Sequence, residues 1–214
     1  MRTLVVGDVH GCAGELSELI GKAACDAVVL VGDLYTKGPD PVGVYRQIRE
    51  LGARAVLGNH DQRLREVIAG RRPRDVAGAR CVDLLDAADP SWRDHLRALP
   101  LSLQLATGQR VVHAGLHPSG DLGRTTFEMA ISMRRYPGDG EADPWWVDVY
   151  DGPPVISGHD ARRGLVRRER AGAPWVIGLD TGCVYGGQLS GWVPETDELY
   201  QVPAARVYEA ITKR

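Results

Sequence analysis

The chain has 214 residues, of which 43% are hydrophobic and 25% are charged, enough apolar content for a packed core. Its 26 Lys and Arg residues nearly balance 28 Asp and Glu residues, so the net charge of −2 excludes an overall basic field of the kind that binds nucleic acids or anionic membranes. We therefore expect one domain over residues 1–214, no general nucleic-acid binding, and any anion-binding site in a local patch.

Cysteine usage and hydropathy indicate a cytoplasmic protein. Cys12, Cys25, Cys81 and Cys183 are scattered without a CxxC pair, as is typical of reduced thiols. The sequence shows no signal-peptide pattern and no membrane span, since its longest aliphatic run is the AVVLV of residues 27–31. No feature of the sequence indicates the oligomeric state.

The opening third alternates short β-branched runs with helical patterns. Residues 2–6, 27–31 and 54–57 are apolar runs that end at glycine, which is typical of buried strands. Between them, ELSELIGKAA (15–24) and PVGVYRQIREL (41–51) carry apolar residues at helical spacing. This order predicts a β-α-β-α-β unit with a parallel sheet and right-handed crossovers.

The rest of the chain indicates helices followed by further strands. Residues 62–98 are rich in Arg, Ala and Asp and are predicted to be helical, whereas YPGDGEADP (136–144) has the composition of an exposed loop. Apolar runs predict further strands at 101–105, 110–114, 154–157 and 174–179, and a terminal strand pair through 193–202.

Polar side chains with metal-binding chemistry follow one predicted strand after another. Asp8 and His10 lie two residues apart in VVGDVHG, so both project to the same side of an extended segment and could share one ion. The other candidates after strand-like runs are Asp33, Asn59, His60, His113 and His159. All lie near the carboxyl ends of predicted strands, where open α/β sheets form their sites.

The candidate set offers oxygen and nitrogen donors and no thiolate, which suits manganese, iron or zinc. Each member alone has an ordinary interpretation, because Asp is common at helix N-caps, Asn in turns and His in packed cores. Four of the six histidines follow strand-like runs in this way, which is difficult to attribute to chance. The whole set therefore favours a metal site.

The motifs GDVHG, GDLYTKGPD, GNHD, VVHAGL, GH and GLDTGCVYGGQL occur in this order between residue 7 and about residue 190. In these motifs the chain resembles the calcineurin-like metallophosphoesterases, in particular the phosphoprotein phosphatase branch and its bacterial members, the symmetrical diadenosine tetraphosphate hydrolases. The resemblance implies an α/β fold, a two-sheet mixed β sandwich flanked by helices, with a binuclear metal site at strand carboxyl ends. It also implies two divalent metal ions as cofactors, with manganese expected and iron, zinc or cobalt as alternatives.

The resemblance further implies a role for each candidate. Asp8 and His10 would hold the first metal, Asp33 would bridge both metals, and the second would be held by Asn59, His113 and His159. Asp33 and His60 would be the catalytic residues, with His60 a general acid near the leaving-group oxygen rather than a ligand. Two such metals can hold a bridging hydroxide and support in-line displacement at phosphorus.

Phosphoryl transfer needs cationic groups that face the non-bridging oxygens. The candidates for binding substrate phosphate are Lys37, Arg63, Arg134 and Arg135. Lys37 follows Asp33 by four residues, and the MRRY segment resembles the phosphate-binding arginine segment of the family. Arg162 and Arg163 follow His159 closely, but a solvated loop is the favoured interpretation for them.

Two motifs depart from the protein phosphatases, because TKG (36–38) replaces their Asp-Arg-Gly and GNHD replaces their GNHE. The first change removes a carboxylate expected to orient His60, and it replaces a bidentate guanidinium with the point charge of a lysine. Asp61 is a candidate for indirect support of His60. The His159 motif lacks the second His of the GHxH nucleases, which weakens a nuclease interpretation.

These observations favour symmetrical hydrolysis of diadenosine tetraphosphate to two ADP. The alternative is a serine/threonine protein phosphatase with broad phosphomonoesterase activity, so the expected substrate is a nucleotide polyphosphate or a phosphoprotein. RNA 5′-end processing and an inactive metal-binding scaffold are less favoured, the latter because no ligand is missing. Trp145, Trp146 and Tyr150 are candidates to stack on adenine, although core or rim packing is the commoner reason for such residues.

Overall fold

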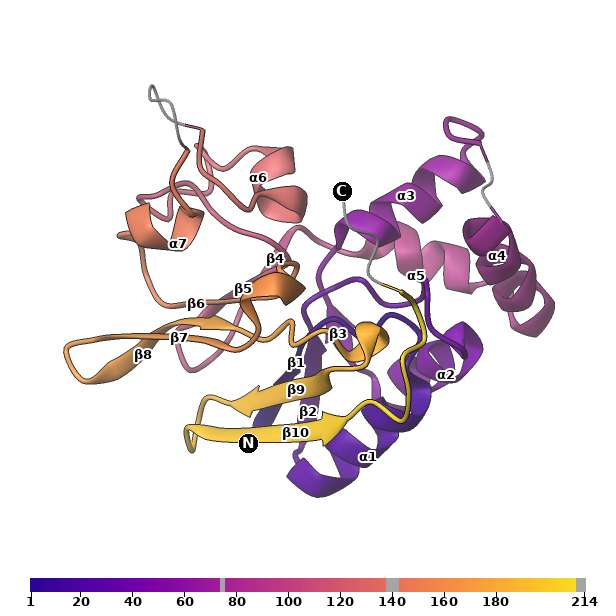
Figure 1. Ribbon diagram of the computed structural model, residues 1–214, viewed down its shortest axis with the longest axis horizontal. Helices are drawn as coiled ribbons and strands as arrows, with labels where there is room; N and C mark the ends of the chain where they lie inside the picture. Colours follow the sequence, from indigo (N-terminus) through magenta and orange to yellow (C-terminus); the bar gives the residue numbers. More distant parts are fainter. Residues whose placement is uncertain (74–75, 138–142, 211–214) are drawn as a thin grey trace.

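The computed structural model describes residues 1–73, 76–137 and 143–210. Within these residues the chain forms two five-stranded sheets flanked by helices (Figure 1), which confirms the α/β two-sheet sandwich expected from the motifs. The predicted loop at 136–144 falls largely on residues 138–142, which lie outside the described residues.

The first sheet, in the order β10-β9-β1-β2-β3, joins the two ends of the chain. Its strands are β1 (Thr3–Val6), β2 (Ala27–Leu30), β3 (Arg54–Ala55), β9 (Gln188–Val193) and β10 (Glu198–Pro203). The first three strands run parallel, as predicted, whereas β9 pairs antiparallel with β1 and places Trp192 opposite Val5. The predicted terminal strand pair is present as β9 with β10, but β9 begins at Gln188 and therefore lies almost wholly before the predicted range 193–202.

The second sheet has the order β4-β5-β6-β8-β7. Its strands are β4 (Ser102–Gln104), β5 (Arg110–Val112), β6 (Val155–Ser157), β7 (Val166–Arg170) and β8 (Ala173–Gly178). β5, β6 and β8 run parallel, and the antiparallel strands β4 and β7 form the two edges. The carboxyl ends of β5 and β6 therefore lie at the same edge of this sheet.

The side chains of β1 point alternately to its two faces, and both faces are buried, each in a different apolar cluster. Val5 lies in an apolar cluster with Val111 and Ile156 of the second sheet, so the two sheets pack face to face. Leu4 and Val6 belong to the larger cluster that includes the apolar residues of the helices on the other face. A strand covered on both sides is expected to be a continuous apolar run, as this one is.

The predicted crossover helices are α1 (Ala13–Ala23) and α2 (Pro41–Leu51). α2 begins after Asp40, whose carboxylate accepts the Gly43 N–H at 2.7 Å, and ends at Gly52 in the left-handed conformation. The predicted helical region 62–98 contains α3 (Asn59–Ile68), α4 (Val76–Ala88) and α5 (Trp92–Ala98).

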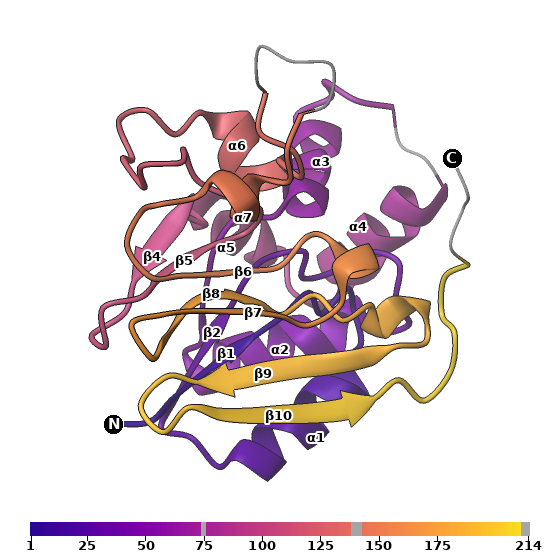
Figure 2. The same cartoon turned by 60° about the vertical axis from the view of Figure 1, so that its left-hand side comes forward.

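Two short helices, α6 (Phe127–Ser132) and α7 (Trp146–Val149), lie beside the second sheet. In Figure 2, α6 and α7 lie on one side of that sheet, and β9 and β10 run along α1 on the other. Short 3₁₀ turns occur at Ala161–Arg163 and Cys183–Tyr185. No helix of the described residues is both long and apolar enough to cross a bilayer. The four cysteines are free thiols.

Candidate metal centre

The candidate metal ligands come together where the two sheets meet. Asp8 and His10 follow β1, and Asp33 follows β2. Asn59 is the first residue of α3, the helix that comes after β3, so strands of the first sheet precede all four residues. His113 and His159 follow β5 and β6 of the second sheet. The strand ends thus bring residues 151 positions apart into contact, because the backbone N–H of His159 donates to Asp8 Oδ1 at 3.1 Å.

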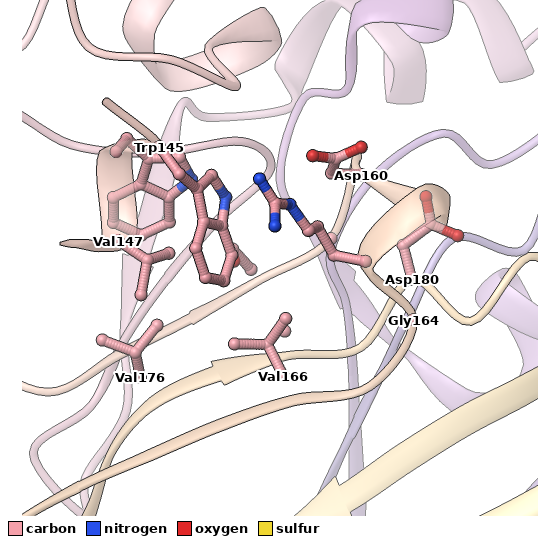
Figure 3. Close-up of a pocket in the computed structure, with 12 residues that line it drawn as sticks. Trp145, Val147, Asp160, Gly164, Val166, Val176 and Asp180 are labelled. Atoms are coloured by element: carbon pink, nitrogen blue, oxygen red, sulfur yellow. The ribbon is translucent and has the colours of Figure 1, made fainter. Parts of the chain in front are cut away.

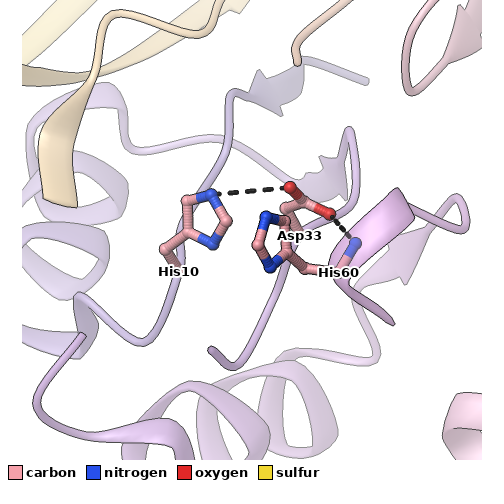
Figure 4. Close-up of side chains that lie close together, drawn as sticks. All are labelled: His10, Asp33 and His60. Atoms are coloured by element: carbon pink, nitrogen blue, oxygen red, sulfur yellow. Dashed lines mark hydrogen bonds and ion pairs between the residues drawn. The ribbon is translucent and has the colours of Figure 1, made fainter. Parts of the chain in front are cut away.

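Asp33 lies between two groups of potential ligands. Its Oδ2 is 3.5 Å from His10 Nε2, and its Oδ1 is 3.5 Å from His113 Nε2. The potential ligand atoms of His10, Asp33 and His60 lie within 4.8 Å of one another (Figure 4), as do those of Asp8, Asp33 and His113. A carboxylate shared by both groups has the geometry that a bridging ligand requires.

Three acceptor atoms converge in the second group. Asn59 Oδ1 is 3.1 Å from His113 Nε2 and 3.1 Å from His159 Nδ1. The opposite ring nitrogens are engaged elsewhere, because His113 Nδ1 is 2.8 Å from the Val31 carbonyl and His159 Nε2 is 3.0 Å from the Ser132 carbonyl. A carbonyl oxygen can only accept, so the ring nitrogens that face Val31 and Ser132 carry the protons, and in the neutral imidazoles the nitrogens that face Asn59 carry lone pairs. Such a group is suited to bind a cation.

The electrostatics also fit divalent cations with oxygen and nitrogen ligands. Burial, with Asp180 and Asp33 nearby, holds the pKa of Asp8 well above its usual value. Burial likewise raises the pKa of Asp33 to about 6. Burial and the neighbouring His113 lower the pKa of His159 to about 2, so its imidazole is neutral and available as a ligand. A cation would offset the repulsion between the carboxylates and bind the neutral imidazoles.

Three of the candidate ligands have a backbone conformation that residues other than glycine rarely adopt. The φ angles of His10, Asp33 and His159 are 47°, 53° and 71°. Such conformations cost about 1–3 kcal/mol each and persist where the surrounding structure enforces them. At Asp33 the buried Asp61 carboxylate does so, because it accepts the backbone N–H of Asp33 at 2.7 Å and of Leu34 at 3.0 Å.

His60 lies at the rim of the first group. Its ring meets the His10 ring edge to face, with centroids 5.0 Å apart, and its backbone N–H donates to Asp33 Oδ1 at 2.8 Å. Thr36 Oγ1 lies 3.4 Å from His10 Nδ1, so this substituted position contacts a different histidine. The carboxylate of Asp61 accepts the backbone N–H groups of Asp33 and Gly58, so these contacts are with the backbone near His60 and not with its ring.

Of the four candidate phosphate-binding cations, Lys37 and Arg134 form hydrogen bonds or close contacts with residues of the ligand cluster. Lys37 Nζ is 3.3 Å from His10 Nε2 and donates to the Tyr185 hydroxyl at 2.7 Å. Arg134 donates to the His159 carbonyl at 3.2 Å, at the other end of the ligand cluster.

The charge of Arg63 acts on His60, whereas the Arg135 side chain forms a hydrogen bond to a backbone carbonyl. Burial, together with Lys37 and then Arg63, lowers the pKa of His60 to about 2, so the field of Arg63 acts at that ring. The guanidinium of Arg135 donates a hydrogen bond to the Asp143 carbonyl at 2.6 Å.

Asp180 and Tyr185 belong to the site region but were not among the predicted residues. Asp180 is 7% exposed, and its charge acts on Asp8, while Tyr185 orients Lys37. Both lie in the GLDTGCVYGG motif, and Asp180 follows β8 as Asp33 follows β2. The pattern of a strand followed by a carboxylate could therefore have identified Asp180.

Comparison with known proteins agrees with the motifs. The family model for calcineurin-like phosphoesterases matches residues 1–205. A symmetrical bis(5'-nucleosyl)-tetraphosphatase of Edwardsiella ictaluri is 32% identical over an alignment of 279 positions, gaps included, which covers 96% of this chain and 97% of that protein. A protein of the same name from Escherichia coli O17:K52:H18 is 36% identical over 182 residues, covering 78% of this chain and 61% of that one.

Solved structures show the same relationship. The crystal structure of a protein provisionally described as a diadenosine tetraphosphatase is 34% identical, with a TM-score of 0.80 over 95% of this chain and 93% of that chain. A serine/threonine phosphatase from Saccharomyces cerevisiae, at 14% identity, reaches a TM-score of 0.59 over 100% of this chain and 81% of that chain, which shows a shared fold alone.

Proposed function

Because the chain belongs to the calcineurin-like phosphoesterase family and is a metallophosphoesterase, we propose that it cleaves diadenosine tetraphosphate symmetrically into two ADP. The observation that carries the chemistry is the placement of Asp33 between two groups of oxygen and nitrogen ligands. The choice of substrate is supported by similarity at 32% identity over nearly the full length of a relative that bears this name. A cytoplasmic location is part of the same proposal.

We assign the cofactor as two divalent metal ions, with manganese as the first choice and iron, zinc or cobalt as alternatives. Asp8, His10 and Asp33 would hold the first ion, and Asp33 would share the second with Asn59, His113 and His159. The potential ligand atom of Asp8 lies within 4.8 Å of those of Asp33 and His113, so Asp8 also lies close to ligands of the second ion. When bound, the ions supply charge neutralisation and a water of lowered pKa. The Val31 and Ser132 carbonyls keep His113 and His159 in the tautomers that ligation needs.

His60 is proposed to protonate the leaving ADP. Burial and the charges of Lys37 and Arg63 keep this ring neutral before substrate binds, because they lower its pKa to about 2. The negative charge of a bound polyphosphate acts in the opposite direction to those cations. A general acid must carry its proton when charge develops on the leaving oxygen, so this role requires the bound polyphosphate to raise the pKa of His60.

Lys37, Arg63, Arg134 and Arg135 are proposed to bind substrate phosphates. Lys37 and Arg134 contact opposite members of the ligand cluster, His10 and His159, so a phosphate chain bound across the cluster would meet a cation on each side. Guanidinium groups bind phosphate oxygens in a bidentate manner, and the lysine supplies a point charge.

The test offers diadenosine tetraphosphate and a phosphoserine peptide separately to chelator-treated protein with added manganese, and resolves the products by chromatography. ADP as the sole nucleotide product, at rates far above peptide dephosphorylation, is the expected result. Asp33→Asn should lower the rate at least about a hundredfold, while Asp94→Asn, at an exposed carboxylate of α5, should not change it. Rapid release of phosphate from the peptide with an inert dinucleotide would instead indicate a protein phosphatase.

A further inference from the structure

A cleft of about 320 Å³ opens next to the metal centre, on the side of Arg134. Its lining consists of Arg134, Arg135, Trp145, Asp160, Arg162 and Arg163. The connection to the centre is direct, because Arg134 donates to the carbonyl of His159, the residue before Asp160. A substrate held at the ligand cluster therefore has this cleft as its neighbour.

The backbone fixes the aromatic and basic parts of the cleft relative to each other. Arg135 pairs with Trp145 in an antiparallel bridge, and the Trp146 N–H donates to the Arg134 carbonyl at 3.2 Å. Trp146 is 4% exposed and anchors this segment in the core, which leaves the half-buried Trp145 at the cleft wall. On the other side, the 3₁₀ turn Ala161–Arg163 presents Arg162 and Arg163.

Positive charge exceeds negative charge in the cleft. The one acidic side chain in its lining, Asp160, is paired with Arg134 at 3.4 Å and with Arg162 at 3.2 Å. Arg135 and Arg163 add two further guanidinium groups to the lining. This excess suits a ligand with several phosphates, whose oxygens guanidinium groups bind well.

The Trp145 ring has two arginines over it. The Arg163 guanidinium carbon lies 4.6 Å from the indole centroid and that of Arg168 lies 5.7 Å from it, so Arg163 forms the closer cation–π pair. Figure 3 shows the recess behind this pair, where Val147, Val166 and Val176 form an apolar wall. The recess holds only about 20 Å³, room for a single water, so a purine must bind in the outer cleft.

We propose that this cleft is the subsite for one nucleoside diphosphate half of the dinucleotide, with the adenine stacked on the Trp145–Arg163 pair and the phosphates on Arg135 and Arg162. The inference rests on the proposed function, because symmetrical cleavage at the metal centre leaves a base and two phosphates to be bound on each side. Base–aromatic and base–guanidinium stacking are sequence-tolerant and strong enough to select a nucleotide over a simple phosphate ester. The subsite makes the enzyme specific for nucleotides.

The test compares kcat/KM for diadenosine tetraphosphate with kcat/KM for p-nitrophenyl phosphate, a phosphate ester without any nucleoside. In Trp145→Ala and in Arg162→Ala the ratio of the two should fall about tenfold, mainly through a higher KM for the dinucleotide. Trp145→Phe keeps an aromatic ring and should stay within about threefold of the wild type. Arg97→Ala removes an arginine of similar exposure on α5, far along the chain from the cleft, and should leave the ratio unchanged.

A second measurement uses ADP as the probe with metal-free protein. Stacking on Trp145 should quench tryptophan fluorescence in the wild type, and this quenching should disappear in Trp145→Phe. If the wild type produces no ADP, the proposed function fails. If it produces ADP but the ratio in Trp145→Ala changes less than twofold, or quenching persists in Trp145→Phe, the subsite alone is refuted.

Discussion

At the scale of single residues, the carboxylate of Asp61 stands out because it contacts backbone rather than substrate. It is fully buried and accepts the N–H groups of Asp33, Leu34 and Gly58 at 2.7, 3.0 and 3.1 Å. These bonds hold Asp33 in its left-handed conformation, with its carboxylate between the two ligand groups. The fourth residue of GNHD is therefore best understood as a positioning residue for Asp33.

Asp61→Asn should destabilise the fold by about 2–3 kcal/mol, because an amide nitrogen must replace one of the two accepting oxygens and then faces at least the Leu34 N–H, donor against donor, in a buried place. Manganese affinity should fall about tenfold, since Asp33 is no longer held in place. Urea unfolding and calorimetric titration check the two effects. Asp26→Asn, at a surface carboxylate that accepts the Arg2 N–H, is the matched control and should cost less than about 1 kcal/mol. Wild-type stability and affinity in Asp61→Asn would contradict the role.

At the scale of secondary-structure elements, glycines allow the strand ends to approach each other. A Cβ on Gly158, at the end of β6, would collide with Asp8 Oδ1 after β1 and would come within 2.7 Å of a Val31 methyl group. A Cβ on Gly58 would similarly meet Asp33 Oδ1. The glycine that precedes a ligand in SGHD and in LGNH thus leaves room for a carboxylate from another strand.

Gly158→Ala should displace the Asp8 carboxylate and lower both manganese affinity and dinucleotide hydrolysis at least tenfold. Gly14→Ala is the matched control, because its added methyl group in α1 meets no atom within 4 Å. That change should raise the free energy of unfolding by about 0.5–1 kcal/mol and leave manganese binding unaltered. Titration with manganese and thermal unfolding give both readouts, and an unchanged affinity in Gly158→Ala would show that β6 tolerates a shift.

Much of the element order was predictable, because periodicity and glycine-terminated runs are local signals. The β-α-β-α-β unit and the strands β4, β5, β6 and β8 follow from them, and so does the association of candidate ligands with strand ends. β7 was not predicted, because its exposed sequence VRRER contains no apolar run. The antiparallel pairing of β9 with β1 is not local, since Val5 meets Trp192 through tertiary packing. Composition also could not separate Trp145 at the cleft wall from Trp146 and Tyr150, which are 4% and 3% exposed and therefore packed in the core.

At the scale of the whole molecule, the candidate metal centre joins the two sheets. Asp8, His10 and Asp33 come from the first sheet, and His113 and His159 from the second. Bound ions would therefore cross-link the layers as well as support catalysis. The positions of these ligands could be inferred from motif order, whereas their left-handed backbone and the bonds that hold it depend on contacts between distant segments.

Saturating manganese should raise the Tm of chelator-treated protein at pH 7.5 by about 10 °C, because a thousandfold excess over Kd stabilises by about 4 kcal/mol. At pH 5 the gain should shrink. Burial raises the pKa of Asp33 to about 6, whereas the pKa of an aspartate in the unfolded chain is 3.8. Protonation of Asp33 therefore stabilises the metal-free folded protein. This stabilisation is fully present below pH 3.8 and is lost as the pH rises through 6. Protons therefore compete with the ion for Asp33 at pH 5 more than at pH 7.5.

Calorimetric scans at both pH values, with Asp33→Asn as the control, check the expected difference in the rise of Tm. An equal rise of Tm at pH 5 and pH 7.5 would contradict the prediction.

The position of β1 between β2 and β9 has a consequence for synthesis of the protein on the ribosome. β1 acquires this second neighbour only when residues 188–193 have been made, long after residues 3–6. Until then one edge of β1 carries unpaired backbone groups that can pair with other chains. All the candidate ligands precede β9 in the chain, so the sheet that carries Asp8, His10 and Asp33 is completed only after every candidate ligand has been synthesised.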